Sequence, residues 1–156
     1  MPGMKVEHIN PFLIASTQVL NQMCSVEIKI GKPYIKSTKY THNSFIIIIG
    51  VTGEMRGQVM IVLENTVACD IASKMCMMPI TQLDELSMSA LSELGNMIMG
   101  NTATIFSTKG IGIDITPPTI CSGDVEFTTT FAKNMCIPLS YEENKIIEIN
   151  IAITQD

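Results

Sequence analysis

Five consecutive residues in the first third of the chain, Phe45–Ile49, constrain the fold more than any other stretch of the sequence. One phenylalanine and four isoleucines follow one another without an intervening polar residue. β-Branched and aromatic side chains favour extended backbone, and successive side chains of a strand point to opposite faces of its sheet. This unbroken run therefore predicts a central strand that is covered on both faces.

The rest of the sequence carries both helical and strand periodicity. Apolar residues at helical spacing predict helices over residues 10–23, 66–77 and 83–107. Asn10 and Asn65 stand where an asparagine caps a helix, although the first helix could also begin near Lys5 with Pro11 inside its first turns. Alternating or continuous apolar residues predict strands over residues 25–30, 34–40, 58–63, 109–116, 125–132, 136–142 and 145–154.

The order of these elements favours one fold class. Helices and strands are interleaved without a regular βαβ rhythm, and glycines at residues 53–57 indicate a hairpin connection. We therefore expect an α+β (mixed α/β) domain, in which long helices pack on a mostly antiparallel sheet.

Length and composition fit a single domain over residues 1–156. Apolar residues make up 46% and charged residues 16% of the chain, so it has enough core material to fold. No apolar stretch is long enough to cross a bilayer, and the first residues lack the basic leader and apolar run of a signal peptide. We therefore expect a cytoplasmic protein without a membrane partner.

Charge and cysteine content argue against several kinds of site. The net charge is −5, and the spaced lysines over residues 29–39 are typical of a solvated edge rather than a nucleic-acid surface. The five cysteines form no CxxC pair and the two histidines stand apart, so neither a disulfide framework nor a metal site is indicated. We expect no cofactor of the chain's own and no nucleic-acid partner.

The helix predicted from Leu83 to Ser107 carries the strongest functional signal. On a helical wheel of about 100° per residue, one stripe of apolar residues is expected to be buried: Leu83, Leu86, Ala90, Leu94, Met97 and Ile105. A second stripe lies to one side of it and stacks along the helix: Ser89, Glu93, Asn96 and Gly100. Its outer members are small, so another surface could come close to Glu93 and Asn96.

Two interpretations of this second stripe are open. Glutamate and asparagine within a helix are commonly solvated residues, but glycine costs about 1 kcal/mol relative to alanine there. Gly95 and Gly100 therefore require packing or a contact that offsets this cost. A carboxylate can pair with a partner's lysine or arginine, and a carboxamide can orient a water for attack on a phosphoryl group. Because the sequence has no P-loop and no acidic metal cluster, such an enzyme would take its metal and phosphoryl group from a partner.

The residues around the stripe resemble the signature of the CheC/CheX/FliY family of phosphatases. The match includes Glu93-Leu94-Gly95-Asn96, with Ser89 before it and Gly100 and Pro117-Pro118 after it. Residues 82–96 and 113–119 are similar to the CheX branch in particular. The resemblance extends from the first helix to the last strands and so covers nearly the whole chain.

This resemblance implies a CheC-like fold and a defined activity. Proteins of the CheX branch dephosphorylate CheY-P, the phosphorylated chemotaxis response regulator. By this similarity Glu93 would form a salt bridge with the regulator's active-site lysine, and Asn96 would orient the water that attacks the aspartyl phosphate. Ser89 and Gly100 would contact the partner, the Mg²⁺ would belong to the regulator, and two copies of the chain would join their sheet edges in a homodimer.

Other functions and a second site are also considered. The chain could be a dimeric module that sequesters the receiver domain without catalysis, or a structural part of a switch like the FliY-type relatives. The first helix repeats the motif spacing as Glu7 and Asn10, but Pro11 follows directly and Ile14 stands where the later helix has Gly100. We expect a relic or a plain helix cap there, outside the site.

Overall fold

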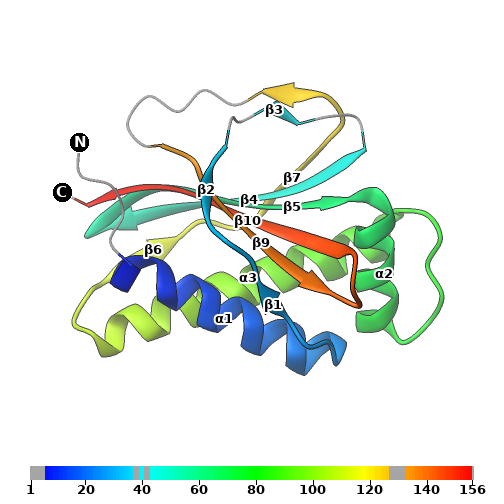
Figure 1. Ribbon diagram of the computed structural model, residues 1–156, viewed down its shortest axis with the longest axis horizontal. Coiled ribbons are helices and arrows are strands. Elements are labelled where there is room, and N and C mark those ends of the chain that lie inside the picture. The colour runs from blue at the N-terminus through cyan, green and yellow to red at the C-terminus, as the bar shows by residue number, and fades with distance from the viewer. Residues whose placement is uncertain (1–5, 37–38, 41–42, 127–132, 156) are drawn as a thin grey trace.

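The computed structural model describes residues 6–36, 39–40, 43–126 and 133–155, and it places the long helices below a curved sheet (Figure 1). The helices are α1 (Val6–Cys24), α2 (Asn65–Cys76) and α3 (Glu85–Thr108). The strands are β1 (Lys29–Ile30), β2 (Tyr34–Ile35), β3 (Lys39–Tyr40), β4 (Ser44–Gly53), β5 (Met55–Glu64), β6 (Ile113–Ile115), β7 (Thr119–Ser122), β8 (Val125–Glu126), β9 (Met135–Tyr141) and β10 (Lys145–Gln155).

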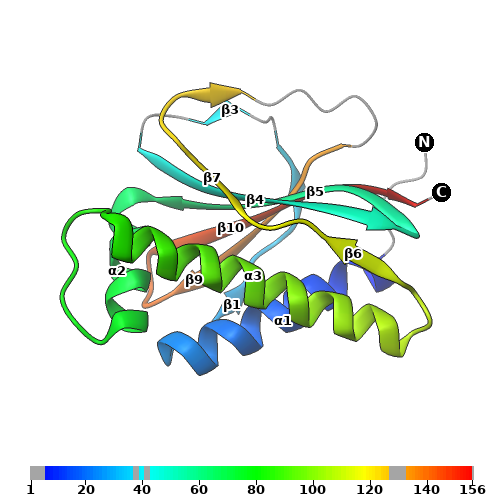
Figure 2. The ribbon, with the colours of Figure 1, turned by 180° about the vertical axis from the view of Figure 1, so that it is seen from behind.

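One antiparallel sheet organises the chain. It has the strand order β1-β9-β10-β5-β4-β6, with β2 also paired to β9 and β7 also paired to β4. All of these pairings are antiparallel. β3 and β8 form a separate two-stranded ladder on the side of the sheet opposite the helices (Figures 1 and 2). The predicted α+β class, with a mostly antiparallel sheet, is confirmed.

The main core lies between the sheet and a layer of helices. α1 and α3 lie side by side on one face of the sheet, and α2 stands at one end of it (Figure 2). Phe12 of α1 and Phe106 of α3 meet edge to face, with 5.5 Å between their ring centroids. Both rings are fully buried, so the two helices are held to each other as well as to the sheet.

Strand β4 has the central, doubly covered position that the run Phe45–Ile49 predicts. It pairs with β5 on one side and with β6 and β7 on the other. Ile47 and Ile49 point into the main core between the sheet and the helices, whereas Ile46 packs with Met60 in a smaller cluster on the opposite face. Because successive side chains of β4 point to opposite faces of the sheet, this one strand contributes to two apolar layers.

Helix α1 begins earlier than its predicted cap. It starts at Val6, so Asn10 lies inside it and is not its N-cap, and Pro11 is buried within the helix. This is the earlier start that the sequence left open. His8 and Ile9 are buried ahead of the proline, so packing of the first turns stabilises helix on the N-terminal side of Pro11.

The N-terminus of α2 also differs from the prediction. Its N-cap position is Glu64, which makes no side-chain capping hydrogen bond, and Asn65 is the first helical residue. The backbone N–H of Asn65 donates to the carbonyl of Asn43 at 2.8 Å. The asparagine therefore contributes to this helix start through its backbone rather than as a side-chain cap.

Several strands are shorter than predicted. Residues 25–30 contribute only β1, and Ser25, which follows the end of α1 at Cys24, has a left-handed φ of 55°. Residues 109–116 contribute only β6, and the predicted strands 34–40 and 125–132 include residues 37–38 and 127–132, which lie outside the described part of the chain. Strand β7 was not predicted, because Pro117-Pro118 directly before it indicated the end of a strand.

Candidate functional site

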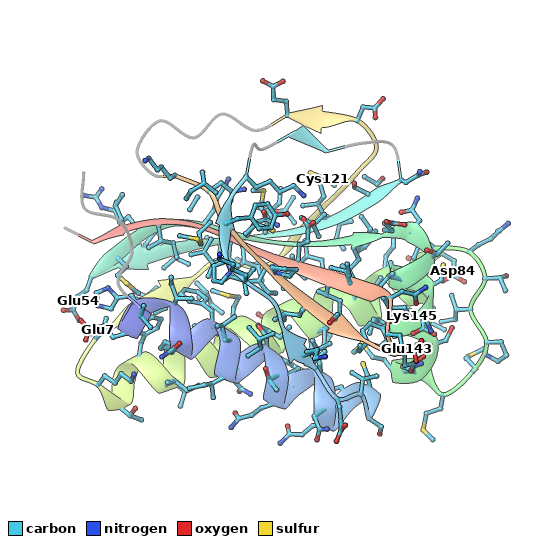
Figure 3. All side chains as sticks on the ribbon, in the orientation of Figure 1. Glu7, Glu54, Asp84, Cys121, Glu143 and Lys145 are labelled. Carbon is cyan, nitrogen blue, oxygen red and sulfur yellow. The ribbon has the colours of Figure 1, made fainter. Side chains whose placement is uncertain are left out.

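Helix α3 carries the predicted site residues, and a capping box fixes its first turn. The backbone N–H of Ser87 donates to the Asp84 carboxylate at 2.9 Å, and the backbone N–H of Asp84 donates to the Ser87 hydroxyl at 2.7 Å. The bond from the Ser87 backbone N–H above all, and after it a side-chain hydrogen bond from Ser87, favour the charged carboxylate and hold the pKa of Asp84 below its usual range. Asp84 is labelled at the start of α3 in Figure 3.

The buried face of α3 is rotated from the predicted one. Leu94 is buried as expected, but Leu86 is 54% exposed, and the other four residues of the predicted stripe are only partly buried. The buried residues are Ser87, Leu91, Leu94, Gly95, Ile98, Met99, Thr102 and Phe106.

A glycine explains this rotation. A Cβ atom at Gly95 would lie 2.8 Å from Cγ2 of Ile47, so α3 meets β4 through a residue without a side chain. A helical wheel centred on the leucines does not predict this face, because the residue of α3 that comes closest to the sheet is a glycine. The cost of Gly95 to the helix is thus offset by packing.

Three residues of the second stripe of α3, Ser89, Glu93 and Asn96, line an open groove of about 640 Å³. Glu93 and Asn96 are exposed, and neither side chain forms a hydrogen bond or ion pair with another residue in the described part of the chain. The opposite wall comes from the segment that joins β6 to β7. The full lining is Glu85, Met88, Ser89, Ser92, Glu93, Asn96, Ile115, Thr116, Pro117, Pro118 and Ile120.

The structure therefore brings three of the four predicted residues together. Ser89, Glu93 and Asn96 share the groove, whereas Gly100 lies one turn beyond its lining. Gly100 is half-buried, and a Cβ atom there would meet nothing within 4 Å in the part of the chain that the structure describes, apart from its own helix. Unlike Gly95, it is not required by packing within the chain.

None of the remaining lining residues is a predicted site residue, although Pro117 and Pro118 belong to the motif that resembles the family signature. Met88 and Ser92 precede Asn96 at intervals of four, so a wider stripe on the wheel would have included them. Met88 is 38% exposed and gives this end of the groove an apolar surface. The far wall depends on sheet pairing, and spacing along the chain carries no signal for that.

The groove has acidic and amide groups rather than a metal centre. Among residues 6–36, 39–40, 43–126 and 133–155, no three His, Cys, Asp or Glu side chains come together in a way that could hold a metal ion. The five cysteines are free thiols. No described helix combines the length and apolar character needed to span a membrane. Glu93 can pair with a cation, and Asn96 can both donate and accept hydrogen bonds.

Solved structures of CheX and CheC-like proteins share this fold. A CheC-like superfamily protein from Shewanella sp. PV-4 matches with a TM-score of 0.85 and 28% identity, over 97% of this chain and 99% of that one. The structure of a CheX–CheY–BeF3–Mg²⁺ complex from Borrelia burgdorferi matches with a TM-score of 0.83 and 32% identity, over 97% of this chain and 100% of that one. The three-helix, antiparallel-sheet fold is thus of the CheC type.

Sequence comparison assigns the family. The model of the family "Chemotaxis phosphatase CheX" matches residues 45–140. CheY-P phosphatase CheX of Thermotoga maritima is 30% identical over 146 residues, which cover 93% of this chain and 94% of that protein. The chain therefore belongs to the chemotaxis phosphatase CheX family, and the resemblance seen in the motif is confirmed. Its class of activity is that of a phosphatase.

Proposed function

We propose that this chain hydrolyses the aspartyl phosphate of a phosphorylated CheY-type response regulator at the α3 groove. The observation that carries the proposal is the placement of Glu93 and Asn96, which are exposed and adjacent on one helix face within one groove. The Thermotoga relative is a CheY-P phosphatase, and a similar CheX has been solved in complex with CheY, BeF3 and Mg²⁺. These relatives support the same substrate class for this chain.

In this proposal Asn96 positions the attacking water. A carboxamide presents a donor and an acceptor at the same end of the side chain, so it can hold a water in line with the phosphorus–oxygen bond that breaks. The regulator supplies its own metal and lysine. Asn96 therefore contributes a fraction of the roughly 7–11 kcal/mol that positioning can provide.

Glu93 is the proposed anchor. Its carboxylate would pair with the active-site lysine of the regulator, and docking would remove both charges from water, which strengthens the pair relative to an exposed one. Glu93 and Asn96 are three residues apart on a rigid helix. The anchor would therefore also set how far the carboxamide reaches into the regulator's site.

Small residues on either side of this pair are proposed to contact the regulator. Ser89 lines the groove, and the space at Gly100 that a side chain would fill is open. Both would let the regulator approach the helix backbone closely. The Mg²⁺ of the reaction belongs to the regulator in this proposal.

We also propose that the chain acts as one domain over residues 1–156 and forms a homodimer through a sheet edge. β1 and β2 lie at an edge, and Ile30, Tyr34 and Ile35 are 48%, 45% and 56% exposed there. Pairing two such edges would cover this apolar surface. Because the proposed partner is a chemotaxis response regulator, the reaction would take place in the cytoplasm.

The alternative function is sequestration of the regulator without catalysis. The test is the decay of a phosphorylated CheY-type receiver with Mg²⁺, with and without this protein, together with binding to the same receiver loaded with beryllofluoride. We expect faster release of phosphate in the presence of the protein. Binding without faster decay would support sequestration and contradict the roles of Glu93 and Asn96.

A further inference from the structure

The groove wall opposite α3 begins where β4 changes partners. β4 pairs with β6 from Val51 onward and with β7 up to Ile48. Between these two ladders, the three residues 116–118, which join β6 to β7, stand opposite only the two residues 49–50 of β4. The extra residue makes the segment bulge away from the sheet, as a β-bulge does.

Thr116 satisfies the β4 backbone at this point. Its backbone N–H donates to the Gly50 carbonyl at 3.0 Å, and the Gly50 N–H donates to the Thr116 hydroxyl at 2.8 Å. One residue thus bonds both backbone groups of Gly50, where the neighbouring strand has left the ladder. A Cβ atom at Gly50 would lie 3.0 Å from Cγ2 of Thr116, so the close contact also favours glycine there.

The next two residues cannot take part in a ladder through an N–H group. Pro117 and Pro118 have none, so they have no donor for the edge of β4. They form part of the wall that faces Glu93 and Asn96 across the groove. The Thr116 hydroxyl also donates to the Pro117 carbonyl at 3.3 Å. The position of this wall therefore depends on how Thr116 is tied to Gly50.

We infer that Thr116 is a positioning residue. Its hydroxyl, which is bonded to Gly50, sets the separation between the Pro117-Pro118 wall and helix α3. This separation determines how tightly the phosphorylated receiver docks. The inference rests on the proposed function, because the receiver is the molecule that enters the groove. Thr116 acts through the wall and does not take part in the hydrolysis itself.

Thr116→Val tests this inference, because it keeps the shape of the side chain and removes the hydroxyl. A methyl group cannot come as close as 2.8 Å to the Gly50 nitrogen, so the segment must move outward. We expect the KM for the phosphorylated receiver to rise roughly five- to tenfold, the equivalent of one hydrogen bond, with kcat nearly unchanged. Thr116→Ser, which keeps the hydroxyl, is expected to restore the wild-type KM.

Thr119→Val is the matched control, because Thr119 is an exposed threonine at the start of β7, three residues after Thr116 and outside the groove lining. Its KM is expected to equal that of the wild type. Hydrogen exchange in the free protein gives a readout without the receiver, and the Gly50 amide should exchange faster in Thr116→Val than in Thr116→Ser or Thr119→Val.

Two results would overturn the inference and are distinguishable. If the wild-type protein is active and Thr116→Val has the same KM, only the role of Thr116 is wrong. If the wild-type protein neither dephosphorylates nor binds the receiver, the proposed function is wrong and the inference falls with it. A melting temperature measured for each variant shows that a changed KM does not come from loss of folded protein.

Discussion

Helices α1 and α3 carry the same Glu-x-x-Asn spacing, but they differ in what faces it. Glu7 and Asn10 of α1 are exposed, as are Glu93 and Asn96 of α3. The helices run in opposite directions, and Glu7 lies at the opposite end of the molecule from Asp84, where α3 begins (Figure 3). The groove lining includes the pair on α3 and neither residue of the pair on α1.

The residues around each motif explain this difference. Four residues after Asn96 stands Gly100, beside open space, whereas four residues after Asn10 stands Ile14, which is 44% exposed. Directly after Asn10 comes Pro11, which is buried inside α1. The comparison teaches that the motif spacing places two side chains together, while a site also needs a second wall and room for a partner.

Among the substitutions that test this comparison, Asn96→Ala is expected to have the largest effect, and the effect is on the rate of hydrolysis. Hydrolysis of the phosphorylated receiver should slow by roughly 100-fold, because loss of one positioned polar group in an active site costs about 10²–10³ in rate. Single-turnover decay at saturating protein measures this directly, and binding to the beryllofluoride-loaded receiver should persist. Asn10→Ala is the matched control on α1, with an expected rate equal to the wild type. An equal loss in the control would mean that α1 carries a second site.

Glu93→Ala is expected to weaken docking itself. Removing one member of a desolvated charge pair costs about 2–5 kcal/mol, which raises Kd roughly 30-fold or more. Calorimetric titration with the beryllofluoride-loaded receiver measures the change, and Glu7→Ala provides the same substitution outside the groove. An unchanged Kd for Glu93→Ala would contradict its role as an anchor, even if hydrolysis slowed.

Gly95→Ala tests how closely α3 packs on the sheet rather than the hydrolysis of the phosphorylated receiver. The added methyl group would meet Ile47 at 2.8 Å, and α1 has Ile9 at the corresponding position of its motif. Overpacking of this kind costs about 1–3 kcal/mol, so the urea midpoint should fall with little change in the m-value. Equal stability of the variant and the wild type would mean that the contact with Ile47 costs no more than the ~0.8–1 kcal/mol that alanine gains over glycine in helix propensity.

Sequence patterns predict some parts of this molecule and miss others. The run Phe45–Ile49 predicted a doubly covered strand because alternation and burial follow directly from side-chain chemistry. The stripe through Glu93 and Asn96 was predicted because spacing on a helix determines which residues share a face. Leu86 was placed in the core and is exposed, since the closest approach to the sheet is made by Gly95, which has no hydrophobic signal.

The far wall of the groove could not be predicted from the sequence for a different reason. Residues 116–118 lie beside α3 only because β4 exchanges β6 for β7 at Gly50, and this exchange is a property of long-range pairing. The same residues suggested the end of a strand, which is correct locally. Their position across from Asn96 depends on where the sheet places them.

Gly100→Ala has the smallest expected effect and separates folding from docking most clearly. Beyond the surrounding turns of α3 itself, no atom of the described residues lies within 4 Å of the added methyl group, so alanine should stabilise α3 by about 0.8–1 kcal/mol, the difference in helix propensity. If the regulator lies against this position, the same methyl group should lower kcat/KM roughly tenfold, because a group forced into a close contact costs about 1–3 kcal/mol. For this variant the free energy of unfolding measured in urea would then rise, whereas the rate of receiver dephosphorylation would fall. A rise in stability with unchanged hydrolysis would place Gly100 outside the interface and leave its presence in α3 without a role in docking.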